Sequence, residues 1–287
     1  MYKRQIILTL VLFVVAYPLY WVIISSISAP SAVSSGKVLL HPIGFTLKGY
    51  AEVFKNDQVM RGFLNSLIIT FCGVMVNLIV TLPTSYALSR SNFSGKKPIT
   101  IFYLITMFFG GGLIPTYLVI QRLQMLNTIW ALILPGCLSV YNMIVARTFF
   151  KSNISEELYE AAEIDGCTQA RFFFQIALPL SKAIIAILVL YYGVGHWNSY
   201  FSALVYISDK AKYPLQLVLR NILITNQTAL SQTATTAAAR AALQEKQQLI
   251  DVMKYSLIII SSIPVLVMYP LVQKHFVKGV MIGSMKG

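Results

Sequence analysis

Half of the acidic side chains of this chain lie in one short polar segment, where they are spaced as charged groups on a helix. The chain has 10 aspartates and glutamates, and residues 151–181 hold five of them: Glu156, Glu157, Glu160, Glu163 and Asp165. Residues three and four apart are neighbours on a helix surface, so Glu156, Glu160 and Glu163 share one face. Carboxylates in this pattern can bind cationic side chains or the amino ends of helices. The segment therefore predicts an amphipathic helix with its acids on one face.

The other residue types that carry chemistry are scattered along the chain. His41, His196 and His275 lie in three different regions, and the three cysteines are far apart, without the spacing of a metal site or a disulfide. The phosphate-binding signature G-x-x-x-x-G-K-S/T is missing. In Gly95-Lys96-Lys97 a lysine stands where the signature requires serine or threonine, and the first glycine is absent. We therefore expect no enzyme activity, no metal, no cofactor and no ATP hydrolysis by this chain itself.

The composition predicts a protein of the lipid bilayer. Hydrophobic residues make up 56% of the chain and charged residues 11%, with a mean hydropathy of +0.68, whereas soluble domains carry about 25% charged residues. The net charge of +13 suits contact with anionic lipid headgroups. A nucleic-acid-binding protein is not expected, because the basic residues lie in short loops and not along one polar face.

Six apolar stretches have about the length of ~20 residues that a membrane-spanning helix needs. They lie at about 5–27, 63–88, 99–120, 129–146, 183–207 and 252–273. We therefore expect an all-α polytopic membrane protein with six transmembrane helices. The first stretch is interpreted as a retained helix and not as a cleaved signal peptide, whose apolar region is about 7–15 residues long.

An even number of spans places both termini on one side of the membrane. Lys3 and Arg4 precede the first span and predict that this side is the cytoplasm. The next segment on that side carries Arg90, Lys96 and Lys97 without an acid, although the outer segment 28–62 also contains basic residues.

Two spans are interrupted by residues that disfavour a regular helix. Gly110–Gly112 precede Pro115 in the third span, and Pro135 and Gly136 lie in the fourth. Irregular backbone in a membrane survives only against protein or a water-filled cavity. These breaks predict either the lining of a transport pathway or close helix packing.

The polar segment reads as two short helices joined by a glycine turn. Ile154, Leu158, Ala161 and Ala162 fall on one apolar face of the first helix. Its start would be capped by Asn153 or Ser155. Gly166 ends this helix, and a second helix runs from about Thr168 to Ile176, before Pro179. The apolar face would be covered either by the chain's own helix ends or by a partner.

The order Glu160-Ala161-Ala162, three residues, Gly166, nine residues and Ile176-Ala177-Leu178-Pro179 resembles the EAA loop of ABC importer permeases. In that family the loop forms coupling helices that dock in a groove of the ATPase subunit. The resemblance implies this role for a set of residues: Glu160, Ala161, Ala162, Asp165, Gly166, Ile176, Leu178 and Pro179.

Further motifs along nearly the whole chain resemble carbohydrate permeases of the MalG-like, maltose-permease type. Examples are Tyr86-Ala87-Leu88-Ser89-Arg90 and the end from Phe276 to Gly287. Gly111–Pro115 and Val280–Ser284 are similar to the LplC/YtcP branch. The family's tail reaches into the ATPase dimer, which implies contacts there for four residues: Lys278, Gly279, Lys286 and Gly287.

The resemblance also implies the type I ABC importer (MetI-like) fold in the bacterial cytoplasmic membrane. One transmembrane domain, 1–287, would comprise the first span and outer loop (1–62), the permease core (63–273) with the coupling loop (151–181), and a cytoplasmic tail (274–287). The implied partners are an ATP-binding cassette ATPase dimer, a second permease subunit, an extracellular solute-binding protein, and a sugar or oligosaccharide substrate.

Other functions remain as alternatives. The EAA motif does not separate sugars from peptides, amino acids or metals as the substrate of an ABC permease. A secondary transporter usually places ionisable groups in the bilayer to couple ions, and the six stretches lack aspartate and glutamate. A membrane-embedded enzyme would need a cluster of acids, bases or metal ligands.

The fifth span contains the candidate substrate-pathway residues Tyr192, His196, Trp197 and Asn198. Polar groups deep in a membrane are functional candidates, and aromatic rings suit the mixed faces of sugars. Aromatic residues also gather at membrane interfaces, so both interpretations stay open. Asn77 is expected to bond between helices, and the loop 208–251 to be either a polar helix or a mobile connector.

Overall fold

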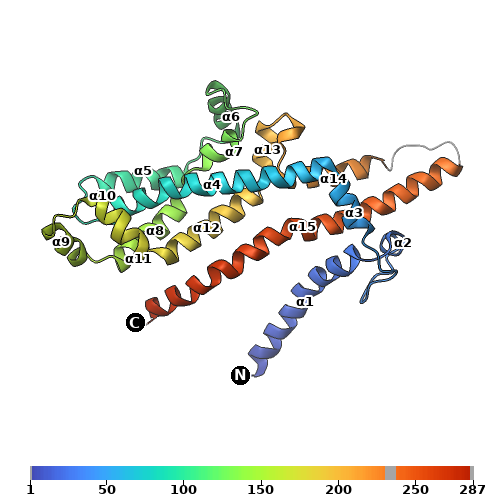
Figure 1. Cartoon of the computed structure of the whole chain (residues 1–287), viewed down its shortest axis with the longest axis horizontal. Coiled ribbons are helices and arrows are strands. Elements are labelled where there is room, and N and C mark those ends of the chain that lie inside the picture. Colours follow the sequence, from blue (N-terminus) through green and yellow to red (C-terminus); the bar gives the residue numbers. More distant parts are fainter. Residues whose placement is uncertain (1, 230–236, 285–287) are drawn as a thin grey trace. The chain divides into compact units, whose positions relative to one another are not determined.

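The computed structural model describes residues 2–229 and 237–284, and it divides the chain into two compact units. Unit 1 comprises Met1–Asn65 and Tyr213–Pro264, and unit 2 comprises Ser66–Lys212 and Val265–Gly287. In the described ranges every regular element is a helix (Figure 1), which confirms the predicted all-α fold. The single-domain organisation stays a prediction.

Unit 1 is built around α1 (Tyr2–Ser26) and the first part of α15 (Ala237–Ser284). The shorter helices are α2 (Pro30–Ser34), α3 (Lys48–Lys55) and α14 (Leu215–Ala229). The Trp21 ring meets the Tyr255 ring edge to face at 5.1 Å, and its Nε1–H donates to the Val38 carbonyl at 2.8 Å. Gly49 lets α3 lie against α15, because a Cβ there would be 2.5 Å from Ser256 Oγ.

Unit 2 contains most of α4 (Asp57–Ser89) and the helices that follow it. These are α5 (Lys96–Phe108), α6 (Leu113–Arg122), α7 (Trp130–Ile133), α8 (Val140–Asn153), α9 (Glu156–Ile164), α10 (Gln169–Phe172), α11 (Leu178–Leu180), α12 (Lys182–Trp197) and α13 (Phe201–Tyr206). Shorter turns lie at Leu134–Gly136, Phe173–Ala177 and Lys210–Lys212. Helix α8 lies close to α5 and α12 within this unit.

In the described part of the chain, three helices are long and apolar enough to cross a membrane without a break. They are Gln5–Ser26, Asp57–Ser89 and Gln247–Pro270. Three further pairs are bent, by 113° between α5 and α6, by 51° between Trp130–Gly136 and α8, and by 80° between Gln169–Leu180 and α12. The predicted total of six spans is reached if each bent pair counts as one span.

The breaks fall where the glycine and proline pattern predicts them, but two predicted spans have wrong boundaries. The third predicted span, 99–120, is not one helix, because Gly112 adopts φ +83° between α5 and α6. The fifth predicted span, 183–207, ends early at Trp197. The sixth predicted span, 252–273, agrees within a few residues with the apolar part Gln247–Pro270, and its helix α15 starts earlier, at Ala237, in a sequence rich in strong helix formers.

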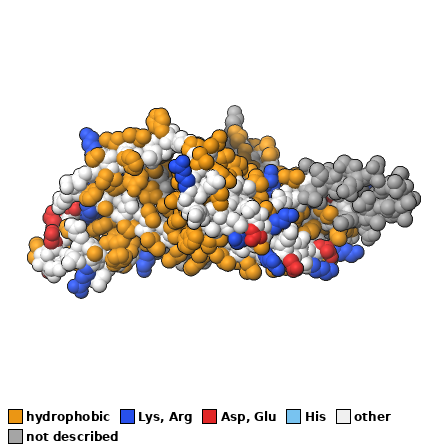
Figure 2. Space-filling model, turned by 90° about the horizontal axis from the view of Figure 1, so that it is seen from above, with side chains coloured by type: hydrophobic (Ala, Val, Ile, Leu, Met, Phe, Trp, Pro, Cys, Tyr) orange, Lys and Arg blue, Asp and Glu red, His pale blue; other side chains and the backbone are white. Residues whose placement is uncertain are grey.

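Helix α1 presents apolar side chains on all sides. Its apolar residues from Ile6 to Leu19 are exposed, as are others on α5 and α6, and apolar side chains cover much of the visible face in Figure 2. A helix that is apolar all round is suited to lipid or to a buried position. The exposed apolar surface therefore agrees with a protein embedded in a bilayer.

Candidate functional site

Capping residues define both ends of helix α9. The Ser155 side chain accepts a hydrogen bond from the Leu158 N–H at 3.3 Å, so Ser155 and not Asn153 caps its start. At the other end Gly166 has φ +78° and donates to the Glu163 carbonyl at 3.0 Å, while Cys167 N–H donates to the Ala162 carbonyl at 2.9 Å. This paired arrangement is a Schellman motif, which confirms the predicted glycine stop.

The second helix of the polar segment is longer than predicted. The Thr168 hydroxyl accepts from the Arg171 N–H at 3.3 Å and caps α10. A π-helical turn over Phe173–Ala177 and helix α11 then carry the chain to Leu180. Single π turns are frequent at functional sites, and this one brings two successive aromatic residues into the core below α9.

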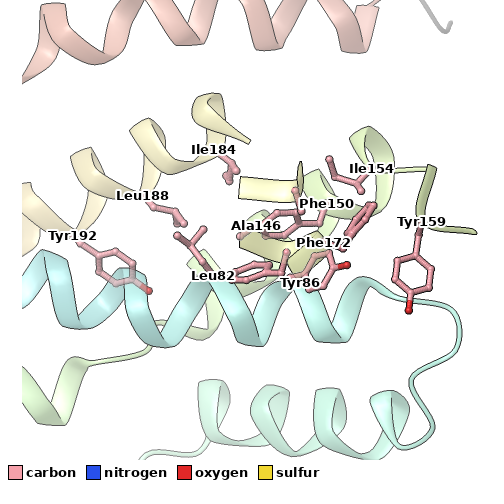
Figure 3. Close-up of a cluster of buried hydrophobic side chains, with 12 residues drawn as sticks. Leu82, Tyr86, Ala146, Phe150, Ile154, Tyr159, Phe172, Ile184, Leu188 and Tyr192 are labelled. Atoms are coloured by element: carbon pink, nitrogen blue, oxygen red, sulfur yellow. The ribbon is translucent and has the colours of Figure 1, made fainter. Parts of the chain in front are cut away.

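Aromatic side chains from α9 and four neighbouring elements pack together and support α9. We call Tyr86, Phe150, Tyr159, Phe172 and Phe173 the aromatic cluster, and all five are buried. Figure 3 labels the first four of them. The Tyr86 ring lies 5.6 Å from that of Phe150 and 5.0 Å from that of Phe173. Phe172 contacts both tyrosines, at 6.4 Å from Tyr86 and 5.2 Å from Tyr159. The cluster thus joins α9 to α4, α8 and α10.

The predicted apolar face of α9 is divided between the chain's own core and its surface. Ile154 is buried but precedes the helix, while Leu158 is 39% exposed and Ala161 is also exposed. The inward face is formed by Tyr159 and Ala162, which pack on the aromatic cluster. Tyr159 has the larger apolar surface and takes the core position. Its spacing of three residues from Ala162 was the sequence signal that could have revealed it.

The outward face of α9 has a large apolar side chain at its carboxyl-terminal end and carboxylates along the preceding turns. Ile164 is 87% exposed. Glu157, Glu160 and Ala161 are exposed as well and lie at helical spacing from Ile164. We call these four residues the outward face. A large exposed aliphatic side chain next to carboxylates is typical of an interaction surface.

Arg90 joins the end of α4 to the start of α9. Its Nη2 donates to the Ile154 carbonyl at 3.0 Å, and its Nη1 lies 3.4 Å from Glu156 Oε2. Glu156 also accepts from the Ser91 N–H at 2.9 Å. Burial raises the pKa of Glu156, but the Ser91 N–H and Arg90 outweigh it and hold the pKa below its ordinary value. The carboxylate therefore stays ionised at neutral pH. Its contribution to the free energy of unfolding is lost only as the pH falls through that lowered pKa.

The candidate substrate-pathway residue His196 lies in a polar network among apolar helices. His196 Nε2 lies 2.7 Å from Asn77 Oδ1, and Asn77 Nδ2 donates to the Gly136 carbonyl at 2.7 Å. The break at Gly136 frees this carbonyl, and a neighbouring helix satisfies it. Asn77 thus bonds between helices, as predicted. A Cβ at Gly73 would lie 2.5 Å from His196 Nε2, so glycine is needed for this contact.

Tyr192 forms a second, separate set of polar contacts. Its hydroxyl lies 2.8 Å from Thr81 Oγ1 and accepts from the Ser139 N–H at 3.1 Å. Tyr192 and Trp197 are buried, whereas Asn198 is exposed. A contact of these residues with substrate stays a prediction, and the geometry shows their packing role.

The remaining predicted coupling residues divide between surface and core. Asp165, Gly166 and Pro179 are exposed, and Ile176 and Leu178 pack against the core that contains the aromatic cluster. The predicted tail contacts Lys286 and Gly287 lie outside the described residues. Lys278 and Gly279 belong to α15, and at these positions only the helical backbone is described.

Comparison with known proteins decides the family. No family model matches the chain. It is 37% identical to the polygalacturonan/rhamnogalacturonan transport system permease protein YtcP of Bacillus subtilis over 94% of its length and 92% of the relative. It is 39% identical to protein LplC of the same organism, over 94% of this chain and 89% of that one. The chain belongs to the family of sugar ABC transporter permeases.

A solved structure agrees with this family and with the fold. The permease superposes with a TM-score of 0.85 and 28% identity on a chain of a bacterial ABC transporter involved in the import of the acidic polysaccharide alginate. The match covers 96% of the permease and 95% of that chain. As a member of this family, the permease is an integral membrane protein and a transport subunit.

Proposed function

We propose that this permease moves an oligosaccharide across the cytoplasmic membrane, driven by a separate ATPase that docks on α9. The observation that supports this most is the outward face of α9, where Ile164 is 87% exposed beside Glu157 and Glu160. The chain lacks a phosphate-binding loop, so the energy has to come from a partner. Both termini and α9 would lie on the cytoplasmic side, where ATP is available.

The complete importer would contain four kinds of component. A solute-binding protein delivers the substrate to the outer face, and a second permease subunit completes the pathway. The ATPase dimer closes on binding ATP and moves α9, which changes the side from which the pathway is open. Substrate and nucleotide must bind these two states with different affinity for such coupling to work.

The favoured substrate is an oligosaccharide that carries carboxylates. Two of the similar proteins are named for a galacturonan and for alginate, and the net charge of +13 favours an anionic solute. Neutral oligosaccharides, peptides and amino acids are the alternatives. A binding assay with the solute-binding protein of the system distinguishes them.

Reversing the charge at Glu160 is expected to remove the ATPase from the complex. The permease is tagged, extracted in mild detergent from its native cells, and the proteins that accompany it are identified. We expect an ATPase, a second permease and a solute-binding protein with the wild type, and loss of the ATPase with Glu160→Lys, because a lysine there would meet the cationic partner groups.

The matched control is Glu52→Lys, which makes the same charge change outside the polar segment, on α3. This variant is expected to retain most of the bound ATPase. Full retention of the ATPase by Glu160→Lys would contradict the docking role of α9.

A further inference from the structure

The carboxyl end of α4 is held by cationic side chains. Arg147 Nε of α8 donates to the Leu88 carbonyl at 3.0 Å, and Lys96 Nζ donates to the Arg90 carbonyl at 3.0 Å. The last carbonyls of a helix have no partner within the helix, and cations near them are favourable. These contacts fix the backbone from which the Arg90 side chain starts.

The Arg90 side chain spans the joint between α8 and α9. Ile154, whose carbonyl it binds, is the residue at which α8 ends, and Glu156 is the first residue of α9. Only 11% of the Arg90 side chain is exposed, and its guanidinium lies 5.0 Å from the centre of the Tyr86 ring. One side chain thus contacts the joint from the end of a membrane span.

The space beside this contact is not filled by packed side chains. A pocket of about 320 Å3 lies there, lined by Arg90, Glu156, Tyr159 and Gln169 among others. Around this pocket the end of α4 and the start of α9 are joined by the polar contacts of Arg90 and Ser91. Tyr159 contributes packing on the opposite side, through Phe172.

We propose that Arg90 is a positioning residue that makes the α8–α9 joint and the end of α4 move as one body, so that a displacement of α9 reaches the membrane span. This inference rests on the proposed docking of the ATPase on α9. A guanidinium binds two acceptors in a fixed geometry, whereas a lysine ammonium is a point charge on a flexible stem. The role therefore depends on the shape of the arginine as well as on its charge.

The test uses the complete complex in proteoliposomes and measures three quantities for each variant. These are the affinity for the ATPase, the basal rate of ATP hydrolysis, and the amount of substrate taken up per ATP hydrolysed. For Arg90→Gln we expect ATPase affinity within about twofold of the wild type and uptake per ATP lowered by about tenfold or more, as for loss of charged hydrogen bonds. Lys97→Gln removes an exposed charge from the same inner segment and should leave all three quantities unchanged.

Conservative variants keep the test decisive if Arg90→Gln fails to accumulate in the membrane. Arg90→Lys retains the charge but cannot hold both acceptors, so uptake per ATP should still fall by several-fold. Glu156→Gln should have a smaller effect of the same kind, since its amide oxygen still accepts from Ser91. In the double variant the two effects should not add, because both changes act on one link.

Two results would overturn the inference. Uptake per ATP that is unchanged in both Arg90→Gln and Arg90→Lys would show that Arg90 transmits nothing. Loss of ATPase binding in Arg90→Lys would show that the residue only maintains the docking surface. Failure of the proposed function would give a different result. The Glu160→Lys permease would then still bind the ATPase, independently of the results for the Arg90 variants.

Discussion

Replacing Phe172 with alanine is expected to lower the free energy of unfolding by about 3–5 kcal/mol, the usual range for removing a buried aromatic ring. Phe172 is completely buried and contacts the rings of both Tyr86 and Tyr159. Its loss would leave a cavity below α9 and remove the support of the inward face. The variant should therefore lose both stability and the ordered position of α9.

Thermal unfolding in detergent measures the first effect, and protease cleavage within residues 151–181 measures the second. We expect a lower melting temperature and faster cleavage for Phe172→Ala. The control is Phe174→Ala, two positions further on, where the side chain is 64% exposed and its removal leaves no cavity. Equal melting temperatures for Phe172→Ala and the wild type would show that the aromatic cluster does not support α9.

Replacing Ile164 with serine is expected to weaken ATPase binding roughly 10- to 150-fold while leaving the fold intact. Burying an isoleucine side chain contributes about 1.5–3 kcal/mol, and each 1.4 kcal/mol is about tenfold in affinity. The side chain is 87% exposed, so its removal affects the isolated permease little.

A titration of the purified ATPase against the permease in detergent measures this effect. Ile154→Val is the control, because Ile154 is 2% exposed and its change should affect stability but not ATPase binding. It should lower stability by about 0.5–1.5 kcal/mol without changing the ATPase affinity. If Ile164→Ser bound the ATPase as tightly as the wild type, the outward face of α9 would not be the docking surface.

The sequence was sufficient to predict features that depend on local chemistry. Glycine and proline mark the breaks at Gly112 and near Gly136, where the bent pairs meet. The cap at Ser155 and the stop at Gly166 follow from residues within one helical turn. Apolar stretches of sufficient length also indicated the membrane class before any contact was known.

Features that depend on contacts between distant residues were not predictable. Arg90 and Glu156 are 66 positions apart, and His196 and Asn77 are 119 positions apart, so no local pattern pairs them. The core position of Tyr159 was not predicted for a related reason. The inward face of α9 is set by Phe172 and Tyr86, which lie outside the helix, and the alanines of the motif are small enough to face either way.

The ends of α12 and α15 differ from the ends of the apolar stretches, because hydropathy counts apolar residues and does not measure helix continuity. Helix α12 ends at Trp197 although the apolar stretch continues. Helix α15 begins in a polar sequence that forms helix through its alanines and glutamines.

The most direct test of the proposed coupling is uptake into proteoliposomes. They contain this permease, the second permease subunit and the ATPase, with the loaded solute-binding protein on the opposite side from α9 and ATP on the same side as α9. The account predicts uptake of a labelled uronate oligosaccharide that stops when ATP or the ATPase is left out. Uptake that continues without both, or that follows an ion gradient, would contradict it and favour a secondary transporter.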